Sequence, residues 1–337
     1  MTSRELAVLA GVSQSTVSRV LNNCENVSDR KRQKVLELAR IYNFELDGNA
    51  RSLKTQKLNR VGVFLSDYFV GFDQNLFWSN IYSRLHTELQ SRGLTALPVY
   101  AYNSSTKIML NRLIGQRQMD RIIMVATDKF YDEDSLQILF EKEIPFVCIY
   151  DRADDDHYYE KEEVNIIALD FKGAGRIAAE FLYQQGHRRI ALQVNPRDRS
   201  NNSRCRGFRR ALPRDCTVQE VSTGKGISSI TFEGGYAAAK AHIDTFHECT
   251  AVLAANDAAA IGMIAALQEH GFDVPGDISV IGINDIPMCK WWRPHLTTVA
   301  FDVQEIIDHT IDLLIERREE TRQIIITPKL VVRESVK

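Results

Sequence analysis

The chain has 337 residues, a length that predicts two or three folding units rather than one. A hydrophobic content of 44% with 26% charged residues is typical of a globular protein with a full core. The sequence contains no recognisable signal segment and no apolar run of about 18 residues, so we expect neither secretion nor membrane insertion.

The six cysteines are scattered along the chain, and none of them forms a CxxC pair. Their spacing indicates neither a structural zinc site nor a redox motif, and it favours free thiols in a reducing cytoplasm. None of the eight histidines lies in a metal-binding or catalytic motif. We therefore expect no metal and no cofactor.

Charge is distributed unevenly along the sequence. Residues 1–60 hold 11 Lys and Arg against 6 Asp and Glu, whereas the rest of the chain holds 31 against 38. The near-neutral total thus conceals a basic N-terminal part attached to an acidic body. A basic, separable N-terminal unit indicates a nucleic-acid partner, although this signal is weak on its own.

The first 22 residues have the spacing of two short helices joined by a tight turn. Thr2-Ser3-Arg4-Glu5 has the form of a capping box, and Gly11 breaks the first helix. Ser13 can cap a second helix that runs to about Asn22. Two helices separated by a short turn that contains glycine predict a helix-turn-helix, and a small helical hairpin without a ligand is the alternative.

The second of these helices divides into a buried and an exposed face. Val17 and Val20 are three residues apart and face the first helix, which leaves the polar residues outside, where a helix in the major groove meets DNA. Glutamine can pair with adenine and arginine with guanine, whereas hydroxyl and amide groups suit phosphates. We assign base contacts to Gln14, Ser15 and Arg19, and DNA backbone contacts to Ser13, Thr16, Ser18 and Asn22.

A third helix is predicted between Asn26 and Phe44, with Ser28 as its N-cap. Its apolar stripe consists of Val35, Leu38, Ala39 and Tyr42. Its first turns carry Arg30, Lys31, Arg32 and Lys34. Basic residues oppose the helix dipole at that end, and this mild cost makes sense if phosphates lie nearby.

Two stretches resemble the lactose/galactose repressor family of bacterial transcription regulators, namely AGVSQSTVSRVLN at residues 10–22 and ARSLK at residues 50–54. In that family the second stretch is a hinge helix that folds on operator DNA and wedges a leucine into the minor groove. The resemblance implies this role for Asn49, Ala50, Arg51, Leu53 and Lys54, with Leu53 as the wedge. The family's usual Pro-Asn is replaced here by Leu46-Asp47, and Gly48 raises the cost of ordering the helix.

From Val61 onward, predicted strands alternate with amphipathic helices in two successive sets. Alternating βα units imply parallel sheets covered by helices, so the body is predicted to be α/β with two doubly wound lobes. A ligand of such a fold is expected beyond the carboxyl ends of the strands, between the lobes.

The resemblance continues through the body in the blocks GHRRIAL, RCRGF, LAAND, ISVIGIND and RPHLTTV. It implies a helix-turn-helix head over residues 1–46, a hinge over 47–59 and a periplasmic-binding-protein-like body over 60–337. The N-lobe is expected at about 60–160 and 290–320, and the C-lobe at about 161–289 and 321–337, with three crossover strands between them. No tetramerising helix follows the last strand, so a homodimer is the expected state.

Family members hold a small effector with residues of three of these blocks. The resemblance implies Arg204, Asn256, Asn284 and Asp285 here, with Asn284 where an aspartate is usual. An amide both donates and accepts, whereas a carboxylate only accepts, so we expect a hydroxyl-rich effector with its own pattern of donors and acceptors. The missing carboxylate also leaves Arg204 with less competing negative charge, which favours an anionic sugar. Asp151, at the end of a predicted strand, and Trp291, as a stacking surface, are further candidates.

Enzyme motifs in the body are weak. Gly173–Ala178 fits GxGxxA after a strand, but the acidic residue that a dehydrogenase needs at the end of the next strand is missing. The sequence TGKGI lacks the spacing of a phosphate-binding P-loop, and the acidic run 151–163 has no recurring ligand spacing for a cation. We predict that the chain is not an enzyme.

Three classes of function compete: a ligand-responsive transcription regulator, a sugar-binding α/β protein with an accidental N-terminal hairpin, and an architectural DNA-binding protein. The basic head and the tandem motifs disfavour the second class, and the two-lobed acidic body disfavours the third. We predict a cytoplasmic, nucleoid-associated repressor of a carbohydrate operon that binds a near-palindromic operator and a sugar-like effector. A regulator that needs a purine- or nucleoside-like corepressor is the alternative.

Overall fold

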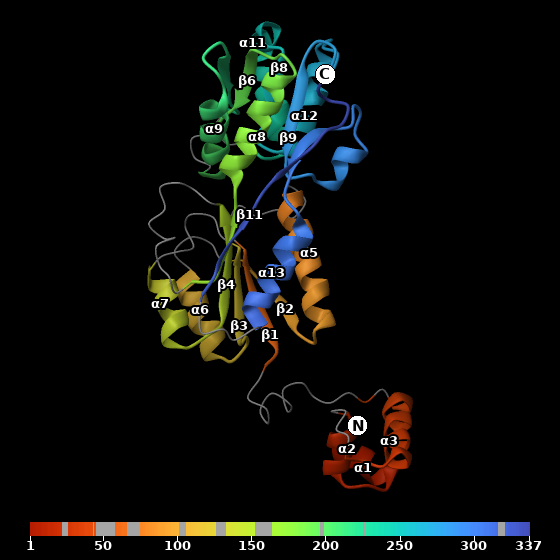
Figure 1. Cartoon of the computed structure of the whole chain (residues 1–337). Coiled ribbons are helices and arrows are strands. Elements are labelled where there is room, and N and C mark those ends of the chain that lie inside the picture. The colour runs from red at the N-terminus through yellow and green to blue at the C-terminus, as the bar shows by residue number, and fades with distance from the viewer. Residues whose placement is uncertain are drawn as a thin grey trace. The chain divides into compact units, whose positions relative to one another are not determined.

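The computed structural model describes residues 1–21, 26–42, 44, 58–65, 75–100, 106–125, 133–151, 164–195, 199–224, 227–315 and 321–337. The chain forms two compact units, Met1–Asn59 and Arg60–Lys337, and each is described by itself below. The fold is α/β with an N-terminal helix-turn-helix, as the sequence predicts (Figure 1).

The described part of the head unit contains the helices α1 (Ser3–Ala10), α2 (Gln14–Leu21) and α3 (Asp29–Ile41). The expected capping box is present, because the Glu5 amide donates to Thr2 Oγ1 and the Thr2 amide donates to the Glu5 carboxylate. Gly11 ends α1 with φ of 66°, a conformation that glycine adopts without steric cost. The small core between the helices contains Leu6, Ala7, Ala10, Val17, Val20, Val35 and Ala39.

Ser28 occupies the expected N-cap position of α3, but its side chain makes no capping hydrogen bond. Burial of Val35 and Ala39 against the other two helices therefore stabilises α3.

The first sheet of the body, which we call the N-lobe sheet, is entirely parallel. Its strands have the spatial order β11-β5-β4-β3-β1-β2. Their bounds are β1 (Arg60–Leu65), β2 (Thr95–Tyr100), β3 (Arg121–Val125), β4 (Phe146–Asp151), β5 (Ile166–Leu169) and β11 (Gln323–Ile326).

Alternating residues of the N-lobe strands serve two separate cores, as the period of two in a strand requires. On β1, Val61 and Val63 join the core under α5 (Leu76–Ser91) and α13 (Val303–Ile315). Phe64 points to the opposite face and joins the core under α6 (Thr106–Gly115) and α7 (Glu133–Glu141). Figure 1 shows these two helix pairs on opposite faces of the sheet.

The second sheet, which we call the C-lobe sheet, has the order β12-β10-β9-β8-β6-β7. Its strands are β6 (Arg189–Gln193), β7 (Thr217–Val221), β8 (Ala251–Leu253), β9 (Ser279–Ile283), β10 (Thr297–Ala300) and β12 (Lys329–Val331). The ladder is parallel except that β12 runs antiparallel to β10. The helices of this lobe are α8 (Phe171–Gln184), α9 (Arg199–Ala211), α10 (Phe232–Ala241), α11 (Ile243–Glu248) and α12 (Asp257–Glu269), with the short 3-10 helix η4 (Pro287–Lys290).

The GxGxxA stretch lies inside α8, where its glycines allow close helix packing rather than phosphate binding. A Cβ at Gly175 would collide with the Arg204 carbonyl oxygen of α9, and a Cβ at Gly207 would collide with the Lys172 carbonyl oxygen of α8. The two helices therefore touch through their backbones. The motif is explained by packing, in agreement with the prediction that the chain is not a dehydrogenase.

The chain crosses between the two sheets three times, at Leu169–Phe171, Ala300–Val303 and Ile326–Lys329 (Figure 1). The expected lobe ranges need correction at these crossings. β5 and β11 belong to the N-lobe sheet rather than to the C-lobe, and β10 belongs to the C-lobe sheet rather than to the N-lobe. β5, β10 and β11 are each only four residues long, so their composition does not tell in which sheet they pair.

Candidate functional site

Helix α2 exposes the side chains that the sequence assigns to base contacts. Val17 and Val20 are buried against the other helices, whereas Gln14, Ser15 and Arg19 are exposed. The Gln14 amide nitrogen donates to Ser3 Oγ at 2.7 Å, which orients the glutamine at the start of the helix. No described residue forms an ion pair with Arg19, so its guanidinium can donate to a base or a phosphate.

Ser13 organises the turn before α2. Its hydroxyl accepts from the Thr16 amide at 3.2 Å, which is the capping role that the sequence predicts. The same hydroxyl lies 2.8 Å from both Ser15 Oγ and Thr16 Oγ1. Ser18 is half-buried, and Asn22 lies outside the described residues. The turn thus gathers hydroxyl groups at the N-terminus of α2, where backbone amides also favour an anion.

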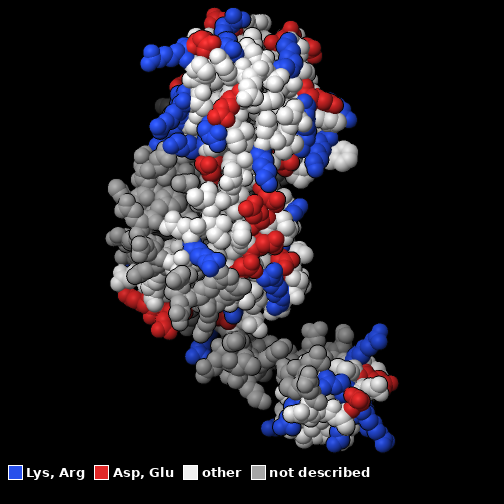
Figure 2. All heavy atoms as spheres, viewed as in Figure 1, with Lys and Arg blue, Asp and Glu red and all other residues white. Residues whose placement is uncertain are grey.

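Basic residues outnumber acidic ones in the described part of the head, and Figure 2 shows Lys and Arg on its visible face. The seven basic residues are Arg4, Arg19, Arg30, Lys31, Arg32, Lys34 and Arg40, against the acidic Glu5, Asp29 and Glu37. This excess favours a polyanionic partner. The expected hinge residues Asn49, Ala50, Arg51, Leu53 and Lys54 lie outside the described residues.

The expected effector residues of the C-lobe lie at the carboxyl edge of its sheet. Asn256 comes shortly after β8, Asn284 and Asp285 follow β9, and Arg204 lies on the helix after β6. These three strands are neighbours in the parallel order β9-β8-β6, so their carboxyl ends share one edge. Open α/β sheets bind ligands at this edge.

Arg204 is 6% exposed and is held on two sides. Its Nη1 donates to the Ala255 carbonyl oxygen, which links α9 to the end of β8. Its guanidinium carbon lies 4.3 Å from the centroid of the Phe171 ring, a cation–π distance. Arg204 is therefore rigid, which is the property needed to orient a ligand.

Asn256 acts as the N-cap of α12. Its side-chain oxygen accepts from the Ala259 amide at 2.9 Å, and its amide donates to the Ile230 carbonyl oxygen at 2.9 Å. Both ends of the side chain thus have a partner inside the protein. One further donor and one lone pair are left for a ligand.

Asn284 is 6% exposed and has φ of 115°, which is rare for a residue other than glycine. Its side-chain oxygen Oδ1 is buried and accepts no hydrogen bond from any residue that the structure describes. An unsatisfied buried carbonyl oxygen costs free energy, and a ligand hydroxyl would supply the missing donor.

The other expected effector residues lie in different surroundings. Asp285 pairs with Arg333, with 2.6 Å between Oδ1 and Nη2. Trp291 is 77% exposed, directly after η4, so it is not enclosed by the C-lobe. Asp151 ends β4 in the N-lobe sheet, and its side chain is outside the described residues.

A buried amide network, which we did not predict, lies at the same edge of the C-lobe sheet. Gln193, the last residue of β6, is fully buried; it donates to the Ser229 carbonyl oxygen at 3.0 Å and accepts from the Ala255 amide at 2.8 Å. Asn201 of α9 accepts from the Asn195 amide at 2.7 Å. A polar residue that ends an apolar strand, as in RIALQ, was the available signal.

Asp257, the last residue of the LAAND block and the first of α12, is a second residue whose burial the sequence did not indicate. It is fully buried, and its carboxylate accepts from the Ile286 amide at 2.9 Å and from the Thr298 hydroxyl at 2.5 Å. These bonds join α12, the turn after β9, and β10. Burial raises the pKa of Asp257 to about 6, and the hydrogen bonds from Thr298 and Ile286 act in the opposite direction.

This raised pKa predicts a pH-dependent stability. Between pH of about 4 and about 6 the folded protein keeps the Asp257 proton that the unfolded chain has released, so the free energy of unfolding falls as pH rises. Urea unfolding of the wild type and of Asp257→Asn from pH 4 to pH 8 measures this contribution. As pH rises to about 6, the free energy of unfolding of the wild type should fall relative to that of the variant. Above about pH 6 the two curves of free energy against pH should run parallel. Parallel curves over the whole range would contradict the raised pKa.

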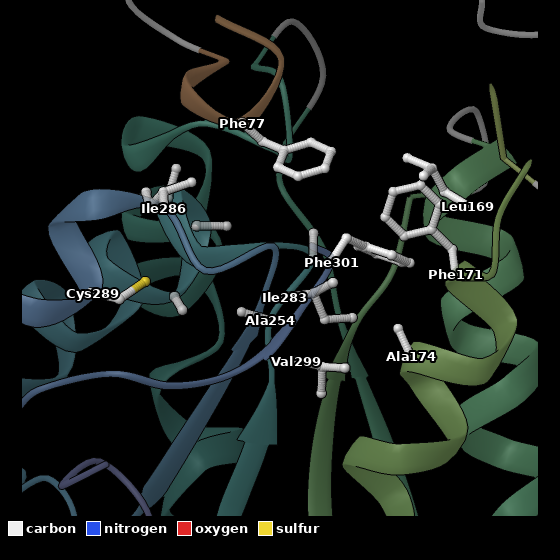
Figure 3. Packing of buried hydrophobic residues seen from close by; sticks show 14 of the residues in the cluster. Phe77, Leu169, Phe171, Ala174, Ala254, Ile283, Ile286, Cys289, Val299 and Phe301 are labelled. Carbon is white, nitrogen blue, oxygen red and sulfur yellow. The ribbon is translucent and has the colours of Figure 1, made fainter. Parts of the chain in front are cut away.

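Aromatic rings pack where the chain crosses between the lobes (Figure 3). Phe171, at the first crossing, meets Phe301, at the second crossing, edge to face with 4.8 Å between ring centroids. Phe77 of the N-lobe helix α5 lies 6.3 Å from Phe301. Because Arg204 also packs on Phe171, a continuous set of contacts joins a candidate effector residue to the N-lobe.

A separate cavity of about 400 Å³ lies between α8 and α9. It is lined by Asp170, Lys172, Gly173, Arg176, Glu180, Gly207, Arg210 and Ala211, and none of the expected effector residues is among them. Its charges are largely used already, because Arg176 pairs with Glu180 at 3.1 Å and Asp170 caps α8. We do not assign a ligand to it.

The described part of the chain contains neither a metal-binding cluster nor a membrane-spanning helix. No group of three or more His, Cys, Asp or Glu side chains is arranged there to hold a metal ion. None of the helices described is long and apolar enough to cross a membrane.

Known protein families match both units of the chain. The profile "Bacterial regulatory proteins, lacI family" matches residues 2–45, and the profile "Periplasmic binding protein-like domain" matches residues 179–336. The probable HTH-type transcriptional repressor ExuR of Bacillus subtilis is 30% identical over 348 residues, covering 100% of this chain and 98% of the relative.

Solved structures share the whole architecture. The lac repressor dimer bound to operator and the anti-inducer ONPF has a TM-score of 0.77 at 23% identity, covering 99% of this chain and 98% of that chain. A complex of the transcriptional regulator CelR with cellobiose has a TM-score of 0.68 at 24% identity and covers 99% of both chains. At these identities the likeness establishes the fold.

Proposed function

Because the chain belongs to the lacI family of bacterial regulatory proteins, which are DNA-binding transcriptional regulators and not enzymes, we propose that it represses a carbohydrate-utilisation operon. A sugar-like effector, bound at the carboxyl edge of the C-lobe sheet, controls its affinity for the operator. DNA binding places the protein in the cytoplasm, and we assign it to the nucleoid.

The roles of the parts follow from this proposal. Residues 1–46 bind the major groove through α2, residues 47–59 form the hinge at the central minor groove, and residues 60–337 bind the effector and form the homodimer. The exposed polar edge of α2 carries the DNA part of the proposal, because Gln14, Ser15 and Arg19 face outward while the valines of the same helix are buried.

The unpartnered Asn284 oxygen carries the effector part of the proposal. Together with the rigid Arg204 guanidinium it offers an acceptor and a donor at the edge where α/β proteins bind ligands. This pair suits a hydroxyl-rich molecule. The CelR structure, which contains cellobiose, has the same fold and supports a sugar as the effector class.

A gel-shift assay on the DNA upstream of the protein's own gene tests the whole proposal. It is run with neutral sugars, sugar acids and nucleosides added singly. Binding that a sugar weakens or strengthens supports a ligand-responsive regulator, and the sign separates an inducer from a corepressor. Binding that no compound changes would contradict the effector role, and absence of binding to every fragment would contradict the regulator.

Arg19→Ala is expected to cost about 1–3 kcal/mol of operator binding and to relax specificity at one base pair in each half-site. The reason is the loss of a bidentate contact to guanine. Binding to a library of operators with single base changes, measured by fluorescence anisotropy, detects both effects. If Arg19→Ala kept the sequence preference of the wild type, Arg19 would contact the DNA backbone rather than a base. Arg40→Ala, at the far end of α3, is the control.

The 77% exposure of Trp291 suggests a role in the dimer rather than in the effector site. Met288, on η4, is also exposed, so apolar surface extends over this segment, and such surface favours a protein interface. Trp291→Asp should shift the protein to monomers and weaken operator binding, because only one half-site is then held. Analytical ultracentrifugation measures this, with Ile315→Asp on α13 as the control. If Trp291→Asp formed a dimer as stable as that of the wild type, Trp291 would not be part of the interface.

A further inference from the structure

The turn after β9 has an unusual backbone. Asn284 and Asp285 have φ of 115° and 54°, and no other consecutive non-glycine residues in the described ranges have positive φ. Such conformations are unfavourable for residues with a Cβ, so they persist only where the surroundings hold them. Groups on three neighbouring elements hold this turn.

Three bonds fix three successive residues of the turn to three different elements. The Asn284 amide donates to the Val299 carbonyl oxygen of β10 at 2.8 Å. The Ile286 amide donates to the Asp257 carboxylate of α12 at 2.9 Å. Between them, Asp285 Oδ1 accepts from Arg333 Nη2 at 2.6 Å. Only the last of these bonds is made between two side chains.

Arg333 is itself held in place. It follows β12 in the C-terminal segment, its amide donates to Thr297 Oγ1 at 2.9 Å, and its Nη1 donates to the Leu296 carbonyl oxygen at 2.7 Å. The side chains of Arg333 and Asp285 are 13% and 23% exposed. A largely buried, charge-assisted hydrogen bond with a fixed donor is strong, and removal of one partner leaves the other charge uncompensated.

We propose that Asp285 and Arg333 form a positioning pair: they hold Asn284 in the conformation that presents its buried carbonyl oxygen to the effector, and Asp285 does not contact the effector itself. The inference rests on the proposed function, because it assigns the effector to that oxygen. It changes the role of Asp285 from an effector contact to a positioning residue. It also assigns a role to Arg333, which the sequence reading did not single out.

The first test measures the turn without any ligand. Hydrogen–deuterium exchange of the full-length dimer is followed on peptides that contain Asn284 and Ile286. Arg333→Met should accelerate exchange there by about tenfold, while peptides from β8 remain unchanged and show that the sheet is intact. Arg333→Lys should restore part of the protection, because an ammonium group keeps the charge but not the fixed fork of donors.

The matched control is Arg188→Met. Arg188 pairs with Asp215 at 3.0 Å in the same lobe, and this pair lies on the segments that flank β6 and β7 rather than on the turn after β9. It should leave exchange at the turn as in the wild type. Equal exchange of the turn in the wild type and in Arg333→Met would overturn the proposal.

The second test uses calorimetry with cellobiose, D-glucose and D-galacturonate as probes. Arg333→Met and Asp285→Asn should each weaken binding of the sugar that the wild type binds by about tenfold, and the double variant should be no weaker than either single variant. If Asp285 touched the sugar, Asp285→Asn would weaken binding clearly more than Arg333→Met, which leaves the carboxylate in place, and the positioning role would be wrong. If the wild type binds none of the probes, the sugar proposal fails for these compounds, whereas the exchange result still decides whether the pair holds the turn.

Discussion

Replacing Arg204 with alanine is expected to abolish the effector response while operator binding is kept. A buried guanidinium makes charge-assisted hydrogen bonds to ligand oxygens, and the loss of two of them is worth about 3 kcal/mol, or more than about a hundredfold in affinity. The head that binds DNA is a separate compact unit, so this change in α9 leaves it folded. Calorimetry against the sugar panel and gel shift with and without sugar measure the two effects.

The control for this prediction must separate binding from stability. Arg204 also donates to Ala255 and packs on Phe171, so alanine leaves a carbonyl oxygen without its donor and a gap beside the ring. Thermal unfolding of Arg204→Ala shows whether the lobe remains folded. The control variant is Arg210→Ala, which removes an exposed arginine from the same helix. A sugar that binds Arg204→Ala as tightly as the wild type would remove Arg204 from the site.

Leu53→Ala is expected to weaken specific operator binding by about 2 kcal/mol or more, which is about thirtyfold, because alanine buries about three fewer methylene equivalents between the base pairs. An apolar wedge releases no counterions. The slope of log affinity against log salt concentration should therefore stay as in the wild type, and non-specific binding should change little. Operator titrations at several salt concentrations measure both quantities.

Lys54→Ala is the matched control for Leu53. It removes a cation from the same predicted hinge and should lower the salt slope by about one unit with a smaller effect on specificity. Unchanged operator affinity of Leu53→Ala would mean that the hinge does not enter the minor groove, as the Leu46-Asp47 replacement would allow.

The sequence predicted the fold well because its signals are local. The capping box at Thr2, the turn at Gly11 and the spacing of Val17 and Val20 all act within a few residues, and each is present in the structure. The lobe assignment of β5, β10 and β11 was wrong for the opposite reason. Pairing between strands depends on partners far away in the chain, and a short apolar run has the same composition in either sheet.

The candidate site was predictable in its position but not in its bonding. The blocks that contain Arg204, Asn256 and Asn284 do meet at one edge of the C-lobe sheet. No pattern indicated that Asp285 pairs with Arg333, 48 residues later, or that Asp257 is buried. The exposure of Trp291 was equally invisible, because burial of a tryptophan depends on tertiary packing.

The three crossings also determine the order in which the molecule can fold during synthesis. The head is complete after about 60 residues, but the N-lobe sheet lacks its edge strand β11 until residues 323–326 have left the ribosome. Helix α13, which packs on β3 and β4, emerges only slightly earlier. The part of the N-lobe sheet that α13 covers, over β3 and β4, therefore stays exposed through nearly all of translation, whereas α5 covers its part of the same face early. Exposed apolar surface of this kind favours aggregation and engages chaperones. A premature stop before residue 300 would release a folded, basic head without a regulated body.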